Sequence, residues 1–375
     1  MAMRRTPPFR ADHVGSLLRP REVAEARERF ERGGLSGAER RAIEDDAIRE
    51  VVAMQREVGL QAITDGELRR RSWHMDFLYA LGGIGRAPSG QAVDFTRPDG
   101  STVVSAQGAL RVEGPVALGE TIFGKDFAFL QSLVPDATPK LTIPSPNMIY
   151  ARGGRAAIDE EVYPDLEEFW SDVIAAYGEE LRRLGAQGCR YLQFDDTSLA
   201  TTNDPRQQEL LRTRGDDPEQ YVADAVRHLN AVIAQRPEGM AITTHMCRGN
   251  YRSSWAAEGS YDFVAEQVFG ELDVDGFFAE FDDERSGGFE PLRFVPKGKV
   301  VVLGLVTTKT AELESKDDLK RRVEEAGRYV PVEQLCLSPQ CGFASTLEGN
   351  DLTPEQQAAK LRLVVETAEE IWGAG

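Results

Sequence analysis

Short apolar segments recur along the chain, and most of them are followed by a stretch with helical periodicity. Each segment has the length of a buried strand and ends in a polar or glycine-containing cluster, as strands do where they leave a sheet. Segments of this kind are found at 9–16, 60–67, 139–146, 189–196, 240–247, 274–281, 299–307 and 333–341. This alternation predicts an α/β fold, a (β/α)8 TIM barrel in which helices surround a ring of parallel strands.

The helical stretches have one apolar and one charged face, as expected for helices that cover a sheet. In LEEFWSDVIAAYGEEL, residues 166–181, the aliphatic and aromatic side chains recur at helical spacing opposite acidic ones. The last helix begins in LTPEQQ, where Thr353 suits the N-cap, Pro354 the first turn and Gln356 the reciprocal capping bond. Its apolar stripe is expected to close against the barrel wall.

The region from about 80 to 135 is longer than a simple connection between a strand and a helix. It contains RPDGSTVVSAQGALRVEG, in which alternating residues flank a Pro-Asp-Gly turn. This pattern predicts an inserted β-hairpin, which we place over the barrel mouth. The chain shows no internal repeat and no low-complexity linker, so we expect one domain spanning residues 1–375.

Composition and charge narrow the class of protein. The chain has 375 residues, 41% hydrophobic and 28% charged, which is ordinary for a globular protein. A formal net charge of −18 opposes binding to nucleic acid, whose phosphates carry the same sign. No segment reaches the roughly 18 uncharged apolar residues of a membrane span, and MAMRRTPPFRADH lacks the apolar core of a secretory signal. We therefore expect a cytoplasmic protein without nucleic-acid or membrane partners.

The chain has four cysteines, and their positions separate them into two pairs. In a protein of this size without a secretory signal, reduced thiols or metal ligation are more typical than disulfides. Cys189 and Cys336 lie within apolar segments and are expected to be small core residues. Cys247 and Cys341 instead lie at the ends of predicted strands, where chemistry is expected.

The active site of a TIM barrel lies at the C-terminal ends of its strands. There, THMC places His245 and Cys247 two residues apart, on one face of a strand, where a nitrogen and a sulfur can reach a common zinc ion. Glu280 closes GFFAE and Cys341 closes CLSPQC, so further ligands could converge from two other strands. The remaining polar residues at strand ends are Ser16, Asp65, Glu67, Asp195, Asp196 and Lys309.

Several motifs resemble the C-terminal catalytic domain of cobalamin-independent methionine synthase, in the same order over nearly the whole chain. They are HVGSLLRP, ITDGELRRRSW, LQFDDTSLA, THMC, FFAEFDDERS and LSPQCG. Two others, WHMDFL and VVLGLVTTKTAELES, are similar to short single-domain relatives that lack the N-terminal barrel of that enzyme. The resemblance implies an enzyme like the 5-methyltetrahydropteroyltriglutamate–homocysteine methyltransferases.

The resemblance also implies a site. Its cofactor would be Zn²⁺, with His245, Cys247, Glu280 and Cys341 as ligands. The amino group of homocysteine would be held by Glu67 and Asp195, and its carboxylate by the loop of Ser16. A thiol with a pKa near 8.5 is mostly protonated at pH 7, whereas zinc would hold it as a thiolate ready to attack a methyl group.

Two departures from the family pattern leave the methyl donor open. Where the larger enzyme has a catalytic histidine after its seventh strand, LGLVTTKTAEL places Lys309, which becomes the candidate for assisting the leaving group. The folate-stacking tryptophan of the family is also absent, and TIPSPNMIY offers Tyr150 in that region. The donor could be a folate, a methylated corrinoid carried on a corrinoid protein, or a small methylated metabolite.

Other hypotheses remain. The related epoxide:coenzyme M transferases alkylate a sulfonated thiol, for which Arg248 and the Arg69–Arg71 tract are candidate anion contacts. A non-catalytic barrel with a structural zinc is disfavoured, because such sites take Cys and His ligands close together in sequence. Among the histidines, His228 reads as a surface or half-buried helix residue, while roles for His13 and His74 stay open. The sequence carries no signal for an oligomeric state.

Overall fold

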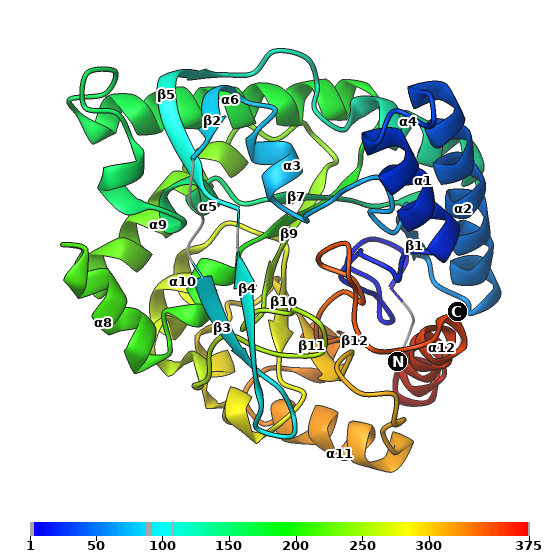
Figure 1. Ribbon diagram of the computed structural model, residues 1–375. Coiled ribbons are helices and arrows are strands. Elements are labelled where there is room, and N and C mark those ends of the chain that lie inside the picture. The colour runs from blue at the N-terminus through cyan, green and yellow to red at the C-terminus, as the bar shows by residue number, and fades with distance from the viewer. Residues whose placement is uncertain (1–3, 88–91, 107, 374–375) are drawn as a thin grey trace.

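The computed structural model describes residues 4–87, 92–106 and 108–373, and its centre is a six-stranded parallel sheet (Figure 1). The strands are hydrogen-bonded in chain order, each to the next. They are β7 (Leu141–Pro144), β8 (Tyr191–Asp195), β9 (Ala241–Met246), β10 (Gly276–Glu280), β11 (Val300–Val306) and β12 (Leu335–Pro339). Every one of these strands falls inside a segment that the apolar pattern predicts, which confirms the α/β class and the parallel sheet.

Two shorter pairings extend this sheet toward a ring. β1 (Ala62–Ile63) pairs in parallel with β6 (Thr138–Pro139), which directly precedes β7. At the other side, Ala11 forms a single parallel bridge to Leu337 of β12. The arrangement is therefore a TIM-barrel-like parallel sheet.

The predicted strand at 9–16 is reduced to that bridge, because side chains bind several of its backbone groups: Lys140 donates to the carbonyl oxygen of His13 and Gln193 to that of Val14. Asp12 is fully buried and accepts hydrogen bonds from Lys140 Nζ at 3.2 Å and from the Tyr191 hydroxyl at 2.8 Å. The ring of His13 contacts the carbonyl oxygen of Ala62 at 3.2 Å. These contacts hold the segment in place through side chains and leave little regular ladder.

Helices lie outside the curved row of strands (Figure 1). They are α1 (Arg21–Glu31), α2 (Gly37–Glu57), α3 (Met75–Leu78), α4 (Gly124–Leu133), α5 (Asn147–Ala151), α6 (Leu166–Ala186), α7 (Thr197–Thr201), α8 (Pro205–Thr213), α9 (Pro218–Ile233), α10 (Ala265–Glu271), α11 (Lys316–Ala326) and α12 (Pro354–Trp372). Short 3₁₀ helices lie at Gly154–Ala157, Tyr261–Phe263, Glu284–Ser286, Glu290–Phe294 and Val332–Gln334. None of the helices in the described ranges is long and apolar enough to cross a membrane.

The helix ends follow the capping rules read from the sequence. Thr353 and Gln356 form the reciprocal capping box of α12, with Pro354 in its first turn, as predicted. Ser36 and Glu39 form a second box at α2. The buried face of α12 packs against β12 and α2.

The insertion contains two antiparallel pairs. β2 (Gly82–Arg86) pairs with β5 (Leu110–Ala117), and β3 (Ala92–Thr96) pairs with β4 (Thr102–Ala106). The Pro-Asp-Gly sequence occupies the turn between β3 and β4. Thr96 bridges to Trp255, which joins this hairpin to the loop after β9.

Candidate active site and metal centre

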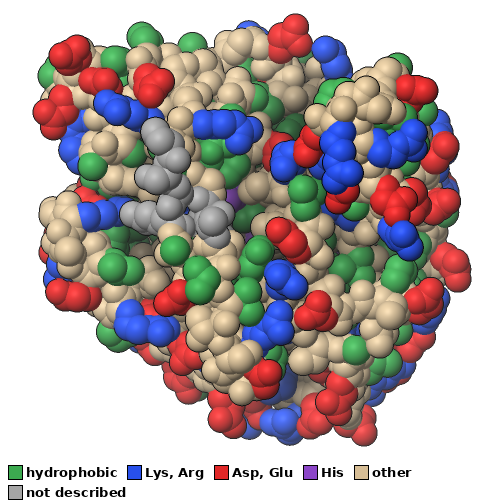
Figure 2. All heavy atoms as spheres, viewed as in Figure 1, with side chains coloured by type: hydrophobic (Ala, Val, Ile, Leu, Met, Phe, Trp, Pro, Cys, Tyr) green, Lys and Arg blue, Asp and Glu red, His purple; other side chains and the backbone are tan. Residues whose placement is uncertain are grey.

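A cavity of about 780 Å³ opens among the loops that follow the parallel strands. Figure 2 shows this face hollowed near its centre, with a histidine visible inside and basic side chains along part of the rim. The cavity is lined by six of the residues singled out in the sequence: Ser16, Glu67, Asp195, His245, Cys247 and Cys341. Residues 92–95 of β3 line it as well.

His245, Cys247 and Cys341 form a group that could hold a metal ion. A ring nitrogen of His245 and the two sulfur atoms lie within 4.8 Å of one another, and all three residues are buried. The Sγ atoms are 3.6 Å apart. β9 carries His245 near its end and Cys247 just beyond it, whereas Cys341 follows β12, so residues 94 positions apart meet at one point.

The donor set and its surroundings fit zinc. His245 Nδ1 lies 3.2 Å from Oδ1 of Asp195, and its buried Nε2 has no hydrogen-bond partner among the described residues. An orienting carboxylate on one ring nitrogen with the other nitrogen free is the usual arrangement of a metal-binding histidine. Two thiols and an imidazole are ligands that zinc prefers.

The candidate ligand atoms of Cys247 and His245 also bind protons. Contact with Cys341 and burial raise the pKa of Cys247 well above its usual range. Burial opposes a charge on His245, but Cys247 and Asp195 outweigh it and raise the pKa of His245 to about 10. A metal ion would have to displace these protons, so its affinity should rise with pH.

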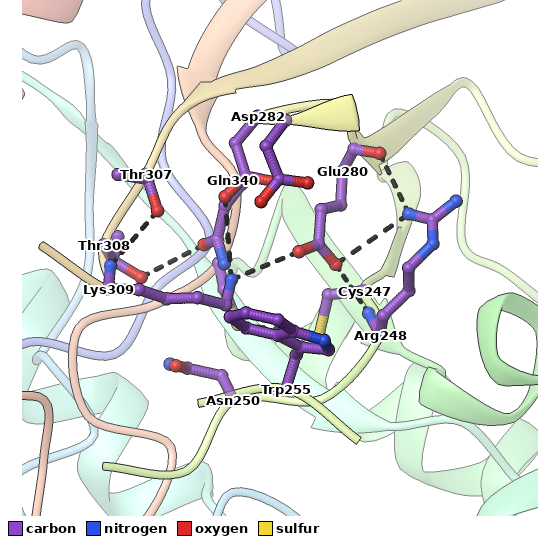
Figure 3. A network of polar contacts seen from close by, with 12 residues as sticks. Cys247, Arg248, Asn250, Trp255, Glu280, Asp282, Thr307, Thr308, Lys309 and Gln340 are labelled. Atoms are coloured by element: carbon purple, nitrogen blue, oxygen red, sulfur yellow. Dashed lines mark hydrogen bonds and ion pairs between the residues drawn. The ribbon is translucent and has the colours of Figure 1, made fainter. Parts of the chain in front are cut away.

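Glu280 lies beside this group and is not one of its three members (Figure 3). Its Oε2 accepts a hydrogen bond from the backbone nitrogen of Arg248 at 2.6 Å. Its Oε1 accepts from Lys309 Nζ at 3.2 Å and from Arg285 Nη2 at 2.5 Å. Burial alone would raise the pKa of Glu280, but Lys309, Arg285 and Arg248 together hold it well below its usual range.

Lys309 is buried in the same network (Figure 3). Its ammonium lies 3.2 Å from Glu280 and 3.7 Å from Oδ2 of Asp282. Burial raises the pKa of Asp282 despite that ammonium. The sequence reading did not single out Asp282 or Arg285, although both lie within FFAEFDDERS, where a run of charges directly after a buried strand is a signal for such a network.

Glu67 combines strain with an unsatisfied carboxylate. It has a φ of 58°, a left-handed conformation that is uncommon for residues other than glycine and that clusters at functional sites. Its Oε1 accepts a hydrogen bond from Thr142 Oγ1 at 2.7 Å, whereas its buried Oε2 has no partner in the described parts of the chain. Burial, with the nearby charge of Asp195, raises the pKa of Glu67.

Ser16 approaches the metal-binding loop closely. A Cβ atom at Gly342 would lie 1.9 Å from Oγ of Ser16, so only glycine fits directly after Cys341. The backbone nitrogen of Phe343 donates to the carbonyl oxygen of Ser16 at 2.9 Å. The first segment of the chain is thereby tied to the loop that carries one sulfur.

Comparison with known proteins decides the family. The family model described as the catalytic domain of cobalamin-independent synthase matches residues 9–370. The chain belongs to this family of methyltransferases.

Relatives agree with this assignment. An uncharacterized protein of Bacillus subtilis, YxjH, is 46% identical over 370 residues, covering 98% of this chain and 96% of its own. A solved structure from Listeria monocytogenes, provisionally assigned as a vitamin-B12 independent methionine synthase, has a TM-score of 0.79 and 37% identity, and it covers 99% of this chain and 100% of its own. The 5-methyltetrahydropteroyltriglutamate–homocysteine methyltransferase of Thermotoga petrophila is 23% identical over 90% of this chain, but the match spans 42% of that longer protein.

In this family member, the arginines considered for anion binding are engaged by the protein itself. Arg248 donates to the carbonyl oxygens of Gly259, Glu280 and Ser286. Arg69 is ion-paired with Asp45 and Arg71 with Glu31, while Arg70 donates to Thr142. A different arginine, Arg152, lines the cavity, and the sequence reading did not identify it.

His13, His228 and the two other cysteines have structural surroundings. Burial, then the charge of Lys140, lowers the pKa of His13 to about 4. His228 is buried and stacked on Trp170, with ring centroids 3.8 Å apart, so the expected surface or half-buried position is corrected. Cys189 and Cys336 are buried in the core, as predicted.

Proposed function

We propose that this methyltransferase is zinc-dependent and converts homocysteine to methionine. The observation that carries the proposal is the group of His245, Cys247 and Cys341 on the wall of a cavity that also exposes Glu67 and Asp195. A thiol-activating metal and two carboxylates for an ammonium group are the features that an amino-acid thiol requires. Glu280 completes the proposed ligand set, from its position against the backbone nitrogen of Arg248, one residue after Cys247.

Each residue has a distinct task in this reaction. Asp195 orients the ring of His245 through Nδ1 and leaves Nε2 for the metal. The free Oε2 of Glu67 and the carboxylate of Asp195 bind the substrate ammonium, and the loop of Ser16 receives its carboxylate. Zinc, when bound, acts as a Lewis acid that lowers the pKa of a thiol and makes its sulfur a nucleophile at neutral pH.

The transfer itself forms one bond and breaks one bond. The substrate sulfur, having lost its proton, attacks the methyl carbon of the donor, and the bond from that carbon to the leaving atom breaks. The leaving atom then needs a proton, and Lys309 is the residue that we assign to assist it. The ammonium of Lys309 is held by Glu280, the fourth proposed ligand, and by Asp282, and these contacts support the assignment.

The proposal includes the complete barrel. The bridge of Ala11 to β12 and the pairing of β1 with β6 support closure into a (β/α)8 barrel within one domain of residues 1–375. Residues 92–95 line the cavity, and this supports placing the inserted hairpin over the mouth.

The alternative, alkylation of a sulfonated thiol such as coenzyme M, is less well supported. It would draw on Arg248 and Arg69–Arg71, whose guanidinium groups already bind protein partners. An amino-acid thiol instead matches the unpaired carboxylate oxygen of Glu67.

Binding and turnover test these assignments separately. Calorimetry on the zinc-loaded protein should show homocysteine binding and much weaker binding of coenzyme M, and the reverse order would favour the alternative. A donor screen with homocysteine should include methyltetrahydrofolate mono- and polyglutamates, methylcobalamin and small methyl thioethers, read as methionine formed. Failure of homocysteine to bind, or of every donor to yield methionine, would contradict the proposal.

A further inference from the structure

Arg152 is a cation in the candidate active-site cavity. It directly follows α5 and lines the cavity together with Trp73. The described residues offer it no hydrogen bond or ion pair, and its buried Nε is unsatisfied. The residues outside the described ranges (1–3, 88–91, 107, 374 and 375) include no aspartate or glutamate that could neutralise it.

The neighbouring arginines show what a neutralised position looks like. Arg206 lines the same cavity, and its Nη2 lies 2.6 Å from Oδ2 of Asp204. Arg214 also lines the cavity and is paired with Asp216. The chain has 62 acidic and 44 basic residues, so a shortage of carboxylates cannot explain why Arg152 lacks one.

Arg152 is half-buried, so part of its guanidinium has lost water without gaining a counter-charge among the described residues, which is costly. Burial accordingly lowers the pKa of Arg152 to about 10. Such a group persists in a fold when an anionic ligand supplies the missing charge.

His74 adds a second donor behind Trp73 of the cavity lining, because the two ring centroids are 4.3 Å apart. The backbone nitrogen of Met75 donates to Ser72 Oγ at 3.5 Å, which leaves the Ser72 hydroxyl hydrogen free to point at His74 Nδ1, 3.0 Å away. In the tautomer in which Nδ1 accepts from Ser72, Nε2 carries the proton, and Nε2 is buried without a partner in the described chain. Burial, and then the charge of Arg152, lowers the pKa of His74, which favours the neutral ring.

We propose that Arg152 and His74 form an anion-binding subsite of the cavity, which holds a carboxylate, phosphate or sulfonate group of the methyl donor. The inference rests on the proposed function and names the chemical class of its unidentified substrate. The donor is favoured over the thiol because the residues assigned to the thiol contact other groups: Glu67 contacts Thr142 and Arg70, and Asp195 contacts His245. Next to Arg152, the carbonyl oxygen of Ala151 instead accepts a hydrogen bond from Arg214, another residue of the cavity lining.

Sulfate is the first probe, titrated by calorimetry into zinc-loaded protein at low ionic strength. The wild type should bind it, and Arg152→Met should weaken binding by about tenfold or more, because a charge-assisted contact is lost. His74→Phe, which keeps a ring against Trp73, should weaken it by about threefold. Arg206→Met is the matched control and should bind as the wild type does. No sulfate binding by the wild type, or equal binding by Arg152→Met, would overturn the proposal.

Further arms identify the source of the anion. If the donor is a pteroylglutamate, Arg152→Met should bind methyltetrahydrofolate more weakly than the wild type does. Converting the glutamate carboxylates of the ligand to amides should weaken its binding to the wild type in the same way. The two changes together should cost no more affinity than either one alone. If the donor is a smaller anion, sulfate should compete with that donor in the wild type and not in the variant. A tenfold loss of homocysteine or coenzyme M affinity in Arg152→Met would move the subsite to the acceptor and refute the donor assignment.

Two measurements separate the possible failures. Homocysteine that does not bind the wild type contradicts the proposed function, whereas homocysteine that binds normally beside an inert Arg152 contradicts only the subsite. Thermal unfolding then excludes a structural role, because replacing an unpaired charge by methionine should leave the melting temperature unchanged or higher. A clear fall in melting temperature would mean that Arg152 stabilises the fold.

Discussion

The ammonium of Lys309 lies 3.2 Å from Oε1 of Glu280, so the residue assigned to the leaving group and the outermost proposed zinc ligand are paired with each other. Arg285 contacts the same carboxylate oxygen, and the backbone nitrogen of Arg248 contacts the other. Ligation by Glu280 would compete with these cations. If Glu280 binds the metal and Lys309 assists the donor, as proposed, the pair would couple the charge at the metal to the position of the ammonium.

Removing the cation of this pair tests whether it serves turnover. We expect Lys309→Met to slow methionine formation by roughly 10²-fold, the lower range for losing a general acid, with homocysteine affinity changed less than about threefold. The control is Lys309→Arg, which keeps the charge beside Glu280 but is a poor proton donor. Steady-state rates and calorimetric thiol affinities decide the matter, and a normal rate in Lys309→Met would discard the role.

Zinc binding should depend on two of the four cysteines, Cys247 and Cys341. Purified protein should contain about one zinc per chain. Cys247→Ala or Cys341→Ala should abolish tight binding, because each removes a thiolate from the group within 4.8 Å. Cys189→Ala and Cys336→Ala are matched controls from the buried core and should keep the metal. Elemental analysis of a Cys247/Cys341 double variant that still held one zinc would refute the site.

Replacing Glu67 should weaken substrate binding and leave zinc binding unchanged. Glu67→Gln should weaken homocysteine binding by about tenfold to a hundredfold, the range for losing a charged hydrogen bond of about 1.5–3 kcal/mol, with zinc content unchanged. The conservative comparison is Glu67→Asp, which keeps the charge on a shorter side chain. Equal affinities in Glu67→Gln and the wild type would remove this residue from the substrate site.

The raised pKa of Glu67 gives the same variant a pH signature. Between the unfolded pKa near 4.3 and the higher folded value, the native state holds the proton that the unfolded chain releases, so the wild type loses stability as pH rises. Glu67→Gln cannot ionise and should gain stability relative to the wild type from pH 4 to pH 7. Urea unfolding at both pH values measures the difference, and an opposite trend would contradict the buried, raised state.

The sequence located most of this site because the signals were local. Polar residues that end apolar runs fall at one edge of a parallel sheet, so His245 and Asp195 could be placed together before any coordinates. The observed strands β7–β12 likewise lie inside the segments that the apolar runs predict. The hydrophobic periodicity and the position of a strand end are set by a few consecutive residues, so they can be predicted without knowing the long-range contacts.

Other features depend on which side chains meet, and no local pattern carries that information. Glu280 reads as a free ligand in sequence, but Arg285 and Lys309 meet it only after the loops following β10 and β11 come together. From the sequence Arg248 is a candidate substrate contact, but in the structure it donates hydrogen bonds to three backbone carbonyl oxygens. No sequence pattern indicated Arg152, because its proposed role depends on having no hydrogen-bond or ion-pair partner among the described residues. All of these features depend on contacts between residues that are far apart in the sequence.

His228 gives a prediction about stability that is independent of the active site. Burial lowers the pKa of His228 from 6.5 to about 4, while the unfolded chain keeps the ordinary value. The unfolded state then binds more protons between these values, so the wild type should lose roughly 2 to 3 kcal/mol as pH falls from 7.5 to 4.5 through this residue alone.

His228→Phe isolates that contribution. The variant keeps a ring stacked on Trp170 but cannot take up a proton, so its free energy of unfolding relative to the wild type should rise by that amount over the same pH interval. His228→Gln is the control, because it should show the same pH trend from a lower starting stability, having lost the stacked ring. Urea unfolding of the zinc-loaded proteins at both pH values provides the numbers. A pH-independent difference would show that His228 titrates normally and that the packing around Trp170 admits water.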